Sequence, residues 1–271
     1  MLELYHSILS PCAQKVRLVL AEKKLPYQSH LVNVIAKENL QANYLRLNPN
    51  GVVPTLVHNG SAIIESTLIC EYLEDMYPAI SLRPANARAV VDMRIWTKLV
   101  DEKVHPAAGA LMWCSVIRKQ LLQTEATKEK AVAKIKRVPD RDRQQRQMRI
   151  LNDGWNAPEA IHSVTTLRRV FEKMATALQH TPWLAGADLT LADLALAPYV
   201  QAIKQLQLSD PLLNGLPGLL DWFERLSNRS SFVTEIANKL PEDRIEMQRE
   251  LGLQARPTVI RLLNSMSLAG P

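Results

Sequence analysis

The change of hydrophobic period near residue 80 constrains the fold of this chain more than any other feature. Before it, short stretches with strand-like alternation and stretches with helical period follow one another; after it, almost every stretch has helical period. The order of elements in the first part is β-α-β-α-β-β-α. A length of 271 residues accommodates two domains of ordinary size. The sequence therefore predicts a mixed α/β domain followed by an all-helical domain.

Turn and cap residues mark the elements of the first part. Residues 2–5 alternate as a strand, and Ser10 before Pro11 is a helix-start signal, because proline is tolerated in the first turn. Asn59-Gly60 separates two apolar runs, which is the strongest short-range signal for a hairpin. The other elements expected here are a strand at 28–34, a helix at 38–45, hairpin strands at 55–57 and 62–64, and a helix at 65–76.

A connector bracketed by Pro78 and Pro84 separates the two parts. We expect a first domain at 1–80, a linker at 81–87 and a helical domain at 88–271. Within the helical domain we expect an insertion near 125–157 and a C-terminal extension from about residue 240.

Helical period dominates the second part. Helices are expected at 87–120 with an interruption at 105–106, at 157–179, at 191–207 and at 217–229. Thr190 and Asp193 form a capping-box-like helix start, with aspartate in place of glutamate. Pro241 and Pro257 are expected to limit long helices near the C-terminus.

Composition excludes several classes of protein. Three widely spaced cysteines predict free thiols rather than a disulfide framework, and no Cys/His cluster with metal-ligand spacing is present. We find no signal peptide and no apolar run long enough to cross a bilayer, so we expect a cytoplasmic protein without membrane contact. Much of the net charge of +6 comes from residues 128–149, which lack aromatic residues; we interpret them as a solvated helical face or loop and not as a nucleic-acid site.

Three motifs in the first part carry a family resemblance. They are Leu4-Tyr5 … Ser10-Pro11-Cys12 … Val16-Arg17, then residues 48–56 with the sequence NPNGVVPTL, and then residues 64–73 with the sequence IESTLICEYL. In this order the chain resembles the soluble glutathione transferases, over about residues 1–235. The resemblance implies a thioredoxin-like N-terminal domain that binds glutathione and an all-α C-terminal domain.

A narrower resemblance concerns one branch of that family. The stretch from Glu65 to Pro84, the residues Met93 to Lys98 and the Arg- and Gln-rich insertion are similar to the bacterial β-etherases. Members of that branch cleave aryl ethers of lignin-derived compounds with glutathione. The resemblance therefore implies a role in aromatic compound degradation or detoxification.

Two residues compete for the catalytic role. By resemblance to serine-type members, the Ser10 hydroxyl would donate to the glutathione sulfur, although a serine here also serves as a helix N-cap. Cys12 would instead form a mixed disulfide with glutathione, as cysteine-type members do, or it packs as a small apolar residue. Both interpretations stay open for both residues.

The resemblance also implies how glutathione would be held. Val53 and a cis Pro54 would present backbone to its cysteinyl part, Ser66 would bind the γ-glutamyl carboxylate at a helix N-terminus, and Glu65 would pair with the ammonium group. Some family members carry Lys or Gln before the Val-Pro step, where this chain has Val52. Lys37 or Asn50 are the alternatives for binding the glycyl carboxylate.

A second set of residues is expected to line a pocket for the hydrophobic co-substrate between the domains. These candidates are Tyr5, His105, Ala108, Met112, Trp113 and Tyr199. An apolar and aromatic lining suits a flat hydrophobic electrophile, but apolar residues at helical spacing also form ordinary core. Tyr5 and His105 likewise have plain structural interpretations, as a packing residue and a kink residue.

The expected activity is conjugation of reduced glutathione, as co-substrate, to a hydrophobic aromatic electrophile, with cleavage of β-aryl ethers as the narrower form. A glutathione-dependent thiol-disulfide reductase that uses Cys12, or a non-catalytic ligand carrier on the same fold, are the alternatives. We expect a homodimer from the resemblance, and no metal and no nucleic acid as partners.

Overall fold

The computed structural model describes residues 1–268, and the surroundings of side chains up to residue 265. The chain forms two compact units that each contain several segments. The first unit consists of residues 1–100, 176–200 and 218–240, and the second of residues 101–175, 201–217 and 241 onward. Each unit is described by itself.

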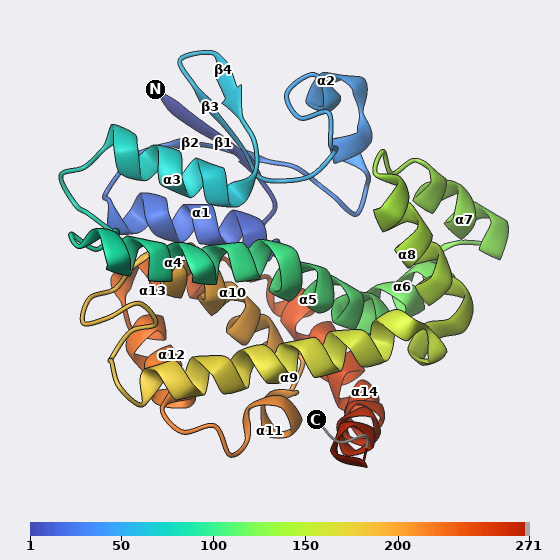
Figure 1. The fold of residues 1–271 in the computed structure, drawn as a ribbon. Helices are drawn as coiled ribbons and strands as arrows, with labels where there is room; N and C mark the ends of the chain where they lie inside the picture. Colours follow the sequence, from blue (N-terminus) through green and yellow to red (C-terminus); the bar gives the residue numbers. More distant parts are fainter. Residues whose placement is uncertain (269–271) are drawn as a thin grey trace. The chain divides into compact units, whose positions relative to one another are not determined.

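A four-stranded sheet with the order β2-β1-β3-β4 is the framework of the first unit (Figure 1). Its strands are β1 (Leu2–His6), β2 (Gln28–Leu31), β3 (Thr55–His58) and β4 (Ser61–Ile63). β1 runs parallel to β2 and antiparallel to β3, and β3 and β4 form the predicted hairpin. Asn59 and Gly60 both have positive φ, as a two-residue type I′ turn requires. The strand expected at 28–34 ends at Leu31.

Two helices cover one face of this sheet. α1 (Pro11–Glu22) and α3 (Ser66–Met76) lie side by side under the strands (Figure 1). Leu2, Leu4 and His6 alternate with less buried residues along β1, so one face of the strand points into the core. Residues 13–20 of α1 are all buried, which makes α1 the central helix of the unit.

The other elements of the first unit are short or helical. The helix expected at 38–45 is a 3₁₀ turn followed by a short α-helix. The remaining elements are η1 (Glu38–Leu40), α2 (Ala42–Leu45), α4 (Ala87–Leu99), the first part of α10 (Leu191–Gln205), α12 (Leu219–Ser227), α13 (Ser230–Glu235) and η5 (Ala237–Lys239). α13 packs against α1.

The predicted capping box before α10 is confirmed. The Thr190 hydroxyl accepts from the Ala192 amide at 3.3 Å, and Asp193 accepts from the Thr190 amide at 3.0 Å. The Asp193 carboxylate also accepts from the Leu184 amide and the Trp222 indole, both at 2.9 Å. Burial raises the pKa of Asp193, and these donors act against that rise. The box therefore ties α10 to α12 as well as capping the helix.

The second unit is helical throughout the described residues. Its elements are α5 (His105–Met112), α6 (Arg118–Thr124), α7 (Lys128–Lys136), α8 (Arg141–Asp153), η4 (Gly154–Asn156), most of α9 (Pro158–Leu178), α11 (Ser209–Leu213) and α14 (Glu242–Leu268). Two π-helical turns, η2 (Val100–Val104) and η3 (Trp113–Ile117), flank α5. The interruption expected at 105–106 is therefore a change of helix type and not a break.

The predicted insertion folds as the helical pair α7 and α8. One apolar cluster contains Cys114 and Ile150, a second contains Ile135 and Leu151, and Trp113 packs against both. The charged side chains of residues 128–149 are mostly exposed, so the basic segment is a solvated helical face as predicted.

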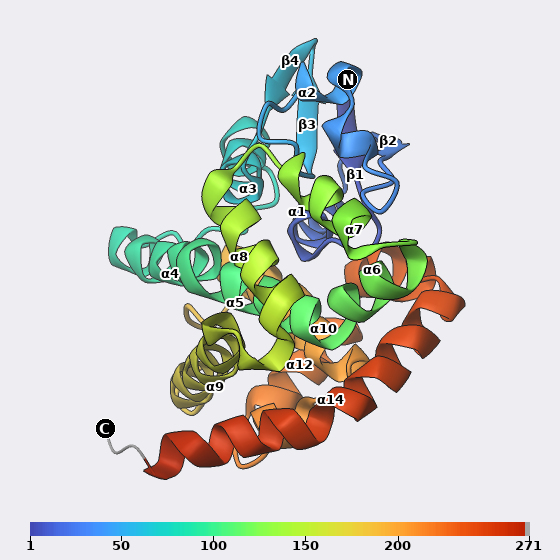
Figure 2. The same cartoon turned by 90° about the vertical axis from the view of Figure 1, so that its right-hand side faces the viewer.

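The C-terminal residues contradict one expectation from the sequence. α14 runs from Glu242 to Leu268 with Pro257 inside it, and Figure 2 shows it as one continuous helix. Pro257 did not end the helix because α14 packs against η3 and α11, and such contacts offset the missing backbone hydrogen bond. Gly252 lies so close to Leu206 that a Cβ there would be 1.9 Å from the Leu206 carbonyl oxygen.

Candidate active site

The loop between β1 and α1 carries Ser10 at the start of the central helix. Ser10 has extended backbone angles and is the N-cap of α1, where its Oγ accepts a hydrogen bond from the Ala13 amide at 3.4 Å. A hydroxyl that accepts one bond keeps its own proton for donation. The two interpretations of Ser10 are thus compatible, because the cap uses a lone pair and a ligand thiolate would use the proton.

The second motif lies beside this loop because of the sheet register. Tyr5 pairs with Thr55, so the residues just before β3 lie next to the residues just after β1. The Val53–Pro54 peptide bond is cis, as the sequence motif predicts. The Val52 carbonyl accepts from the Tyr44 hydroxyl at 2.6 Å and from the Asn48 amide at 3.0 Å.

Tyr44 and Asn48 were not among the residues that the sequence singled out. Both are buried, and both also contact the Thr55 hydroxyl, at 3.0 Å and 3.2 Å. Burial raises the pKa of Tyr44, which therefore stays protonated as a donor. Asn48 stands in the NPNG motif, which the sequence indicated only as a turn. In the structure, its amide also supports the cis-proline turn.

The third motif places a helix N-terminus near these loops. Ser66 is the first residue of α3 and is 8% exposed. Glu65 precedes it with φ of 68°, a left-handed conformation that is uncommon for a residue with a side chain. The Asn50 amide donates to Glu65 Oε1 at 3.3 Å, so two of the candidate glutathione-binding residues are in contact.

Further contacts join the segments that carry these motifs. The buried Lys15 ammonium of α1 donates to the Thr67 hydroxyl of α3 at 2.7 Å. The Asn39 amide of η1 donates to the Gly51 carbonyl at 2.7 Å. Since Lys37 is two residues before Asn39, both candidates for the glycyl carboxylate lie on the loops that this bond connects.

Cys12 and Tyr199 are brought together in the first unit. Cys12 is half-buried in the first turn of α1, and its Sγ lies 3.6 Å from the hydroxyl of Tyr199 on α10. Tyr199 is 1% exposed. The pair forms a partly buried thiol–phenol contact two residues from Ser10.

The other co-substrate candidates have different surroundings. Tyr5 stacks on His30 with ring centroids 4.4 Å apart and meets Tyr44 edge-on, so the structure gives it a packing role. His105 is exposed at the first position of α5. Ala108, Met112 and Trp113 are half-buried on the same helical stretch of the second unit. π-helical turns such as those that flank α5 are frequent at functional sites.

A buried polar network lies behind Ser10. The sequence indicated only one of its members, Arg17 of the first motif, and gave it no role. Arg17 is fully buried on α1, and its Nη1 lies 3.1 Å from His6 Nδ1. Burial and the Arg17 charge lower the pKa of His6 to about 3, so its imidazole is neutral. Arginine only donates, so His6 Nδ1 accepts and its Nε2 donates to the Ser29 hydroxyl at 2.8 Å. The signal in the sequence was a charged residue within an apolar helical stripe.

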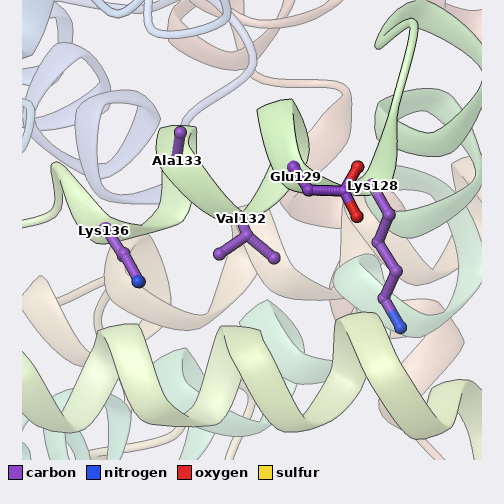
Figure 3. Close-up of a pocket in the computed structure, with 5 residues that line it drawn as sticks. All are labelled: Lys128, Glu129, Val132, Ala133 and Lys136. Carbon is purple, nitrogen blue, oxygen red and sulfur yellow. The ribbon is translucent and has the colours of Figure 1, made fainter.

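Two hollows lie away from these motifs. One, of about 610 Å³, is lined by Leu2, Leu25, Tyr27 and Tyr77 among others, at the end of β1 opposite to Ser10. The other, of about 430 Å³, runs along α7 in the second unit. Figure 3 shows Lys128, Val132 and Lys136 on one side of α7, spaced by one helical turn.

The described residues add two further observations. Within residues 1–268, no three His, Cys, Asp or Glu side chains gather in a way that could hold a metal ion. No helix in this part of the chain combines the length and the apolar character that crossing a bilayer requires.

The fold and the three motifs together define a class of protein. The chain has a thioredoxin-like α/β domain, with a serine-capped first helix and a cis-proline turn, and the rest of its described residues are mainly helical. The family patterns described as "Glutathione S-transferase, N-terminal domain" and "Glutathione S-transferase, C-terminal domain" match residues 9–76 and 141–225, together more than half of the chain. The chain belongs to the glutathione S-transferase family of enzymes.

Individual relatives support the same assignment. The protein LigF of Sphingobium sp. strain SYK-6 is 29% identical over 236 residues, which are 85% of this chain and 91% of LigF. The crystal structure of beta-etherase LigF superposes with a TM-score of 0.77 at 28% identity, over 86% of this chain and 98% of that one. Glutathione S-transferase TCHQD of Arabidopsis thaliana is 28% identical over 85% of this chain and 88% of its own length.

Proposed function

We propose that this enzyme conjugates reduced glutathione to a hydrophobic aromatic electrophile by thiolate attack, and that β-aryl ethers are among its substrates. The observation that carries the proposal is the convergence of the Ser10 cap, the cis Val53–Pro54 turn and the Ser66 helix start at one end of the sheet. The similarity to beta-etherase LigF supports the narrower substrate class.

The first task of the site is to ionise the glutathione thiol. A free thiol has a pKa of about 8.5, so little thiolate is present at neutral pH. Lowering that pKa by two units corresponds to about 2.7 kcal/mol of thiolate stabilisation. The Ser10 hydroxyl donates to the sulfur, and the N-terminus of α1 adds the partial positive charge of the helix macrodipole.

The second task is to hold the tripeptide. Ser66 binds the γ-glutamyl carboxylate with its backbone amide and hydroxyl, Glu65 binds the ammonium group, and the Val53 backbone pairs with the cysteinyl part. Lys37 and Asn50 lie on the loops that would receive the glycyl carboxylate. Tyr44 and Asn48 hold the Val52 carbonyl and so fix the turn that presents Val53.

The third task is displacement at carbon. The thiolate sulfur attacks the carbon that bears the aryloxy group, a C–S bond forms, and the C–O bond breaks with its electron pair leaving on the aryloxide. Protonation of the aryloxide gives a phenol and a glutathione thioether. Tyr199, whose hydroxyl lies beside Cys12 in the first unit, is the aromatic candidate near Ser10 for contact with such a substrate.

A second candidate function rests on Cys12. Its position in the first turn of α1, beside the Tyr199 hydroxyl, suits a thiolate that forms a mixed disulfide with glutathione. The reaction would then be thiol-disulfide exchange: the Cys12 thiolate attacks the glutathione sulfur of a mixed-disulfide substrate, the S–S bond breaks with the substrate thiolate leaving, and a second reduced glutathione displaces Cys12 to give glutathione disulfide. A carrier that binds glutathione or an apolar ligand without turnover is the third candidate.

Calorimetric titration of reduced glutathione separates these functions. We expect millimolar or tighter binding to the wild type and about tenfold weaker binding to Ser66→Ala, because one charge-assisted hydrogen bond to the carboxylate is lost. The exposed Ser61 on β4 provides the control variant Ser61→Ala, which should bind like the wild type.

Turnover assays on the same proteins complete the test. With aryl halides and model aryl ethers, Ser10→Ala should lose most activity and Cys12→Ala should keep it. Turnover of a glutathione mixed disulfide that is lost in Cys12→Ala and kept in Ser10→Ala would instead establish the disulfide reductase, and glutathione binding without turnover of either kind of substrate would establish a carrier. Wild-type protein that fails to bind glutathione at millimolar concentration would refute the transferase and the reductase, and only a carrier of apolar ligands would remain.

The enzyme is proposed to act as a homodimer in the cytoplasm, where glutathione is kept reduced. Leu68 on α3 is 61% exposed, and Val91 and Ile95 on α4 are 50% and 46% exposed. Arg94 of α4 pairs with Glu71 of α3 at 2.9 Å, which places these apolar side chains on adjoining helices. Exposed apolar side chains on adjoining helices favour contact with a second subunit.

A further inference from the structure

Two side chains of α1 hold the loop that carries Ser10 and leads into this helix. The Ile8 carbonyl accepts from the Gln14 amide at 3.1 Å and from Arg17 Nη2 at 3.4 Å. Ser10 is tied to the same loop by its own amide, which donates to the Ser7 carbonyl at 3.2 Å. The position of the Ser10 hydroxyl therefore depends on where Gln14 and Arg17 hold Ile8.

Arg17 connects this loop to two other elements. Its Nη1 donates to His6 at the end of β1, and its Nη2 also donates to the Glu235 carbonyl at the end of α13, at 2.7 Å. Its Nε lies 3.6 Å from the Glu235 carboxylate, which accepts from Tyr27 at 3.0 Å and from Lys239 at 2.6 Å. A planar guanidinium spreads five donors over three nitrogens and so reaches separate acceptors on three elements, whereas the three donors of a lysine ammonium all lie on one nitrogen.

Whether the charge of this cluster changes near neutral pH depends on His6. His6 has a pKa of about 3, so it adds no charge near neutral pH. The charged groups that face the cluster are Arg17 from α1, Glu235 from α13 and Lys239 from η5. The fully buried Arg17 charge lies behind the loop where the thiolate would form, and in a buried setting its attraction for an anion is weakly screened.

We propose that Arg17, together with Gln14, is a positioning residue that sets the ionisation of the glutathione thiol by fixing the Ile8 carbonyl and hence the Ser10 hydroxyl. Through Glu235, the same arginine makes the position of the catalytic loop depend on α13. The inference rests on the proposed function of Ser10.

The test measures the pKa of enzyme-bound glutathione from the thiolate absorbance in difference spectra. The variants are Gln14→Met, which removes one donor at similar size, and Arg17→Lys, which keeps the charge but loses the fork. We expect the bound thiol pKa to rise by about one unit in each, so that kcat falls about threefold at pH 7, by close to tenfold well below the wild-type pKa, and recovers at higher pH. Glutathione affinity should change little, because the γ-glutamyl site at Ser66 is intact.

Lys23→Met is the matched control. Lys23 is also buried on α1, at its far end, where it pairs with Glu74 at 2.7 Å. This variant should lose thermal stability and keep the wild-type thiol pKa. If Gln14→Met and Arg17→Lys also lower only the melting temperature, the positioning role is refuted. Gln14→Met decides the matter if Arg17→Lys does not fold. A wild type without a thiolate band would instead refute the proposed function itself.

Discussion

At the scale of single residues, buried polar groups take roles that their sequence context does not show. Ser10 was identified because its chemistry and its helix-start position coincide in three adjacent letters. Arg17 meets its partner Glu235 only through the fold, and Tyr44 and Asn48 reach Val52 and Thr55 across a turn whose hydrogen bonds no helix or strand spacing reports. Sequence patterns report local spacing, so candidate ligand-binding groups could be proposed from the sequence, whereas the buried groups that contact their loops could not.

His6 gives a prediction about pH. Its pKa is about 3 in the folded protein and 6.5 in the unfolded chain, so between these values the unfolded state binds more protons. The stability that the neutral imidazole contributes is complete above pH 6.5 and is lost as the pH falls toward 3. We expect the free energy of unfolding to decrease by up to about 1.4 kcal/mol per pH unit in this window from this residue.

Urea titrations from pH 4.5 to 7.5 measure this effect. His6→Asn keeps an acceptor for Arg17 but does not titrate, so its stability should depend less on pH than that of the wild type. The exposed His180 provides the control His180→Asn, which should follow the wild type. Parallel pH curves for wild type and His6→Asn would contradict the buried neutral histidine.

At the scale of elements, local signals in the sequence predicted the starts of helices and the turn of the hairpin better than they predicted the ends of helices. The Ser10 cap, the Asn59-Gly60 hairpin and the Thr190–Asp193 box are each complete within a few residues, and all three are present. Proline strongly disfavours the interior of a helix, but the tertiary packing of α14 outweighs this preference at Pro257. The contacts of α14 with η3 and α11 join residues more than a hundred and about forty positions apart, which no local pattern reports.

Pro257 leads to a prediction about stability. Proline inside a helix costs about 3 kcal/mol relative to alanine, because it lacks the amide that bonds to the preceding turn. Pro257 is exposed, so Pro257→Ala should restore that bond without loss of buried contacts and raise the urea midpoint of unfolding. The exposed Pro158 at the first position of α9 is the control, where alanine should bring no such gain. A lower midpoint for Pro257→Ala would show that the proline shapes the helix for its packing.

At the scale of the whole molecule, the apolar surface of α3 and α4 leads to a prediction about assembly. We expect the wild type to sediment at twice the chain mass of 30.5 kDa. The variant Ile95→Glu should dissociate into monomers, because burying an unpaired carboxylate opposes association. Leu253 on α14 has the same exposure of 46%, so Leu253→Glu is a matched control that should remain dimeric. A wild type that sediments as a monomer at all concentrations would contradict the proposed assembly.

The close approach of Gly252 to Leu206 limits how the C-terminal helix can vary in evolution. Adding one residue to α14 before this point would turn every later position by about 100° and advance it by 1.5 Å, so that a side chain would meet the Leu206 carbonyl. The number of residues between the start of α14 and Gly252 is therefore fixed more strictly than their identities. We therefore expect changes in the length of α14 to be tolerated after Gly252 and not before it.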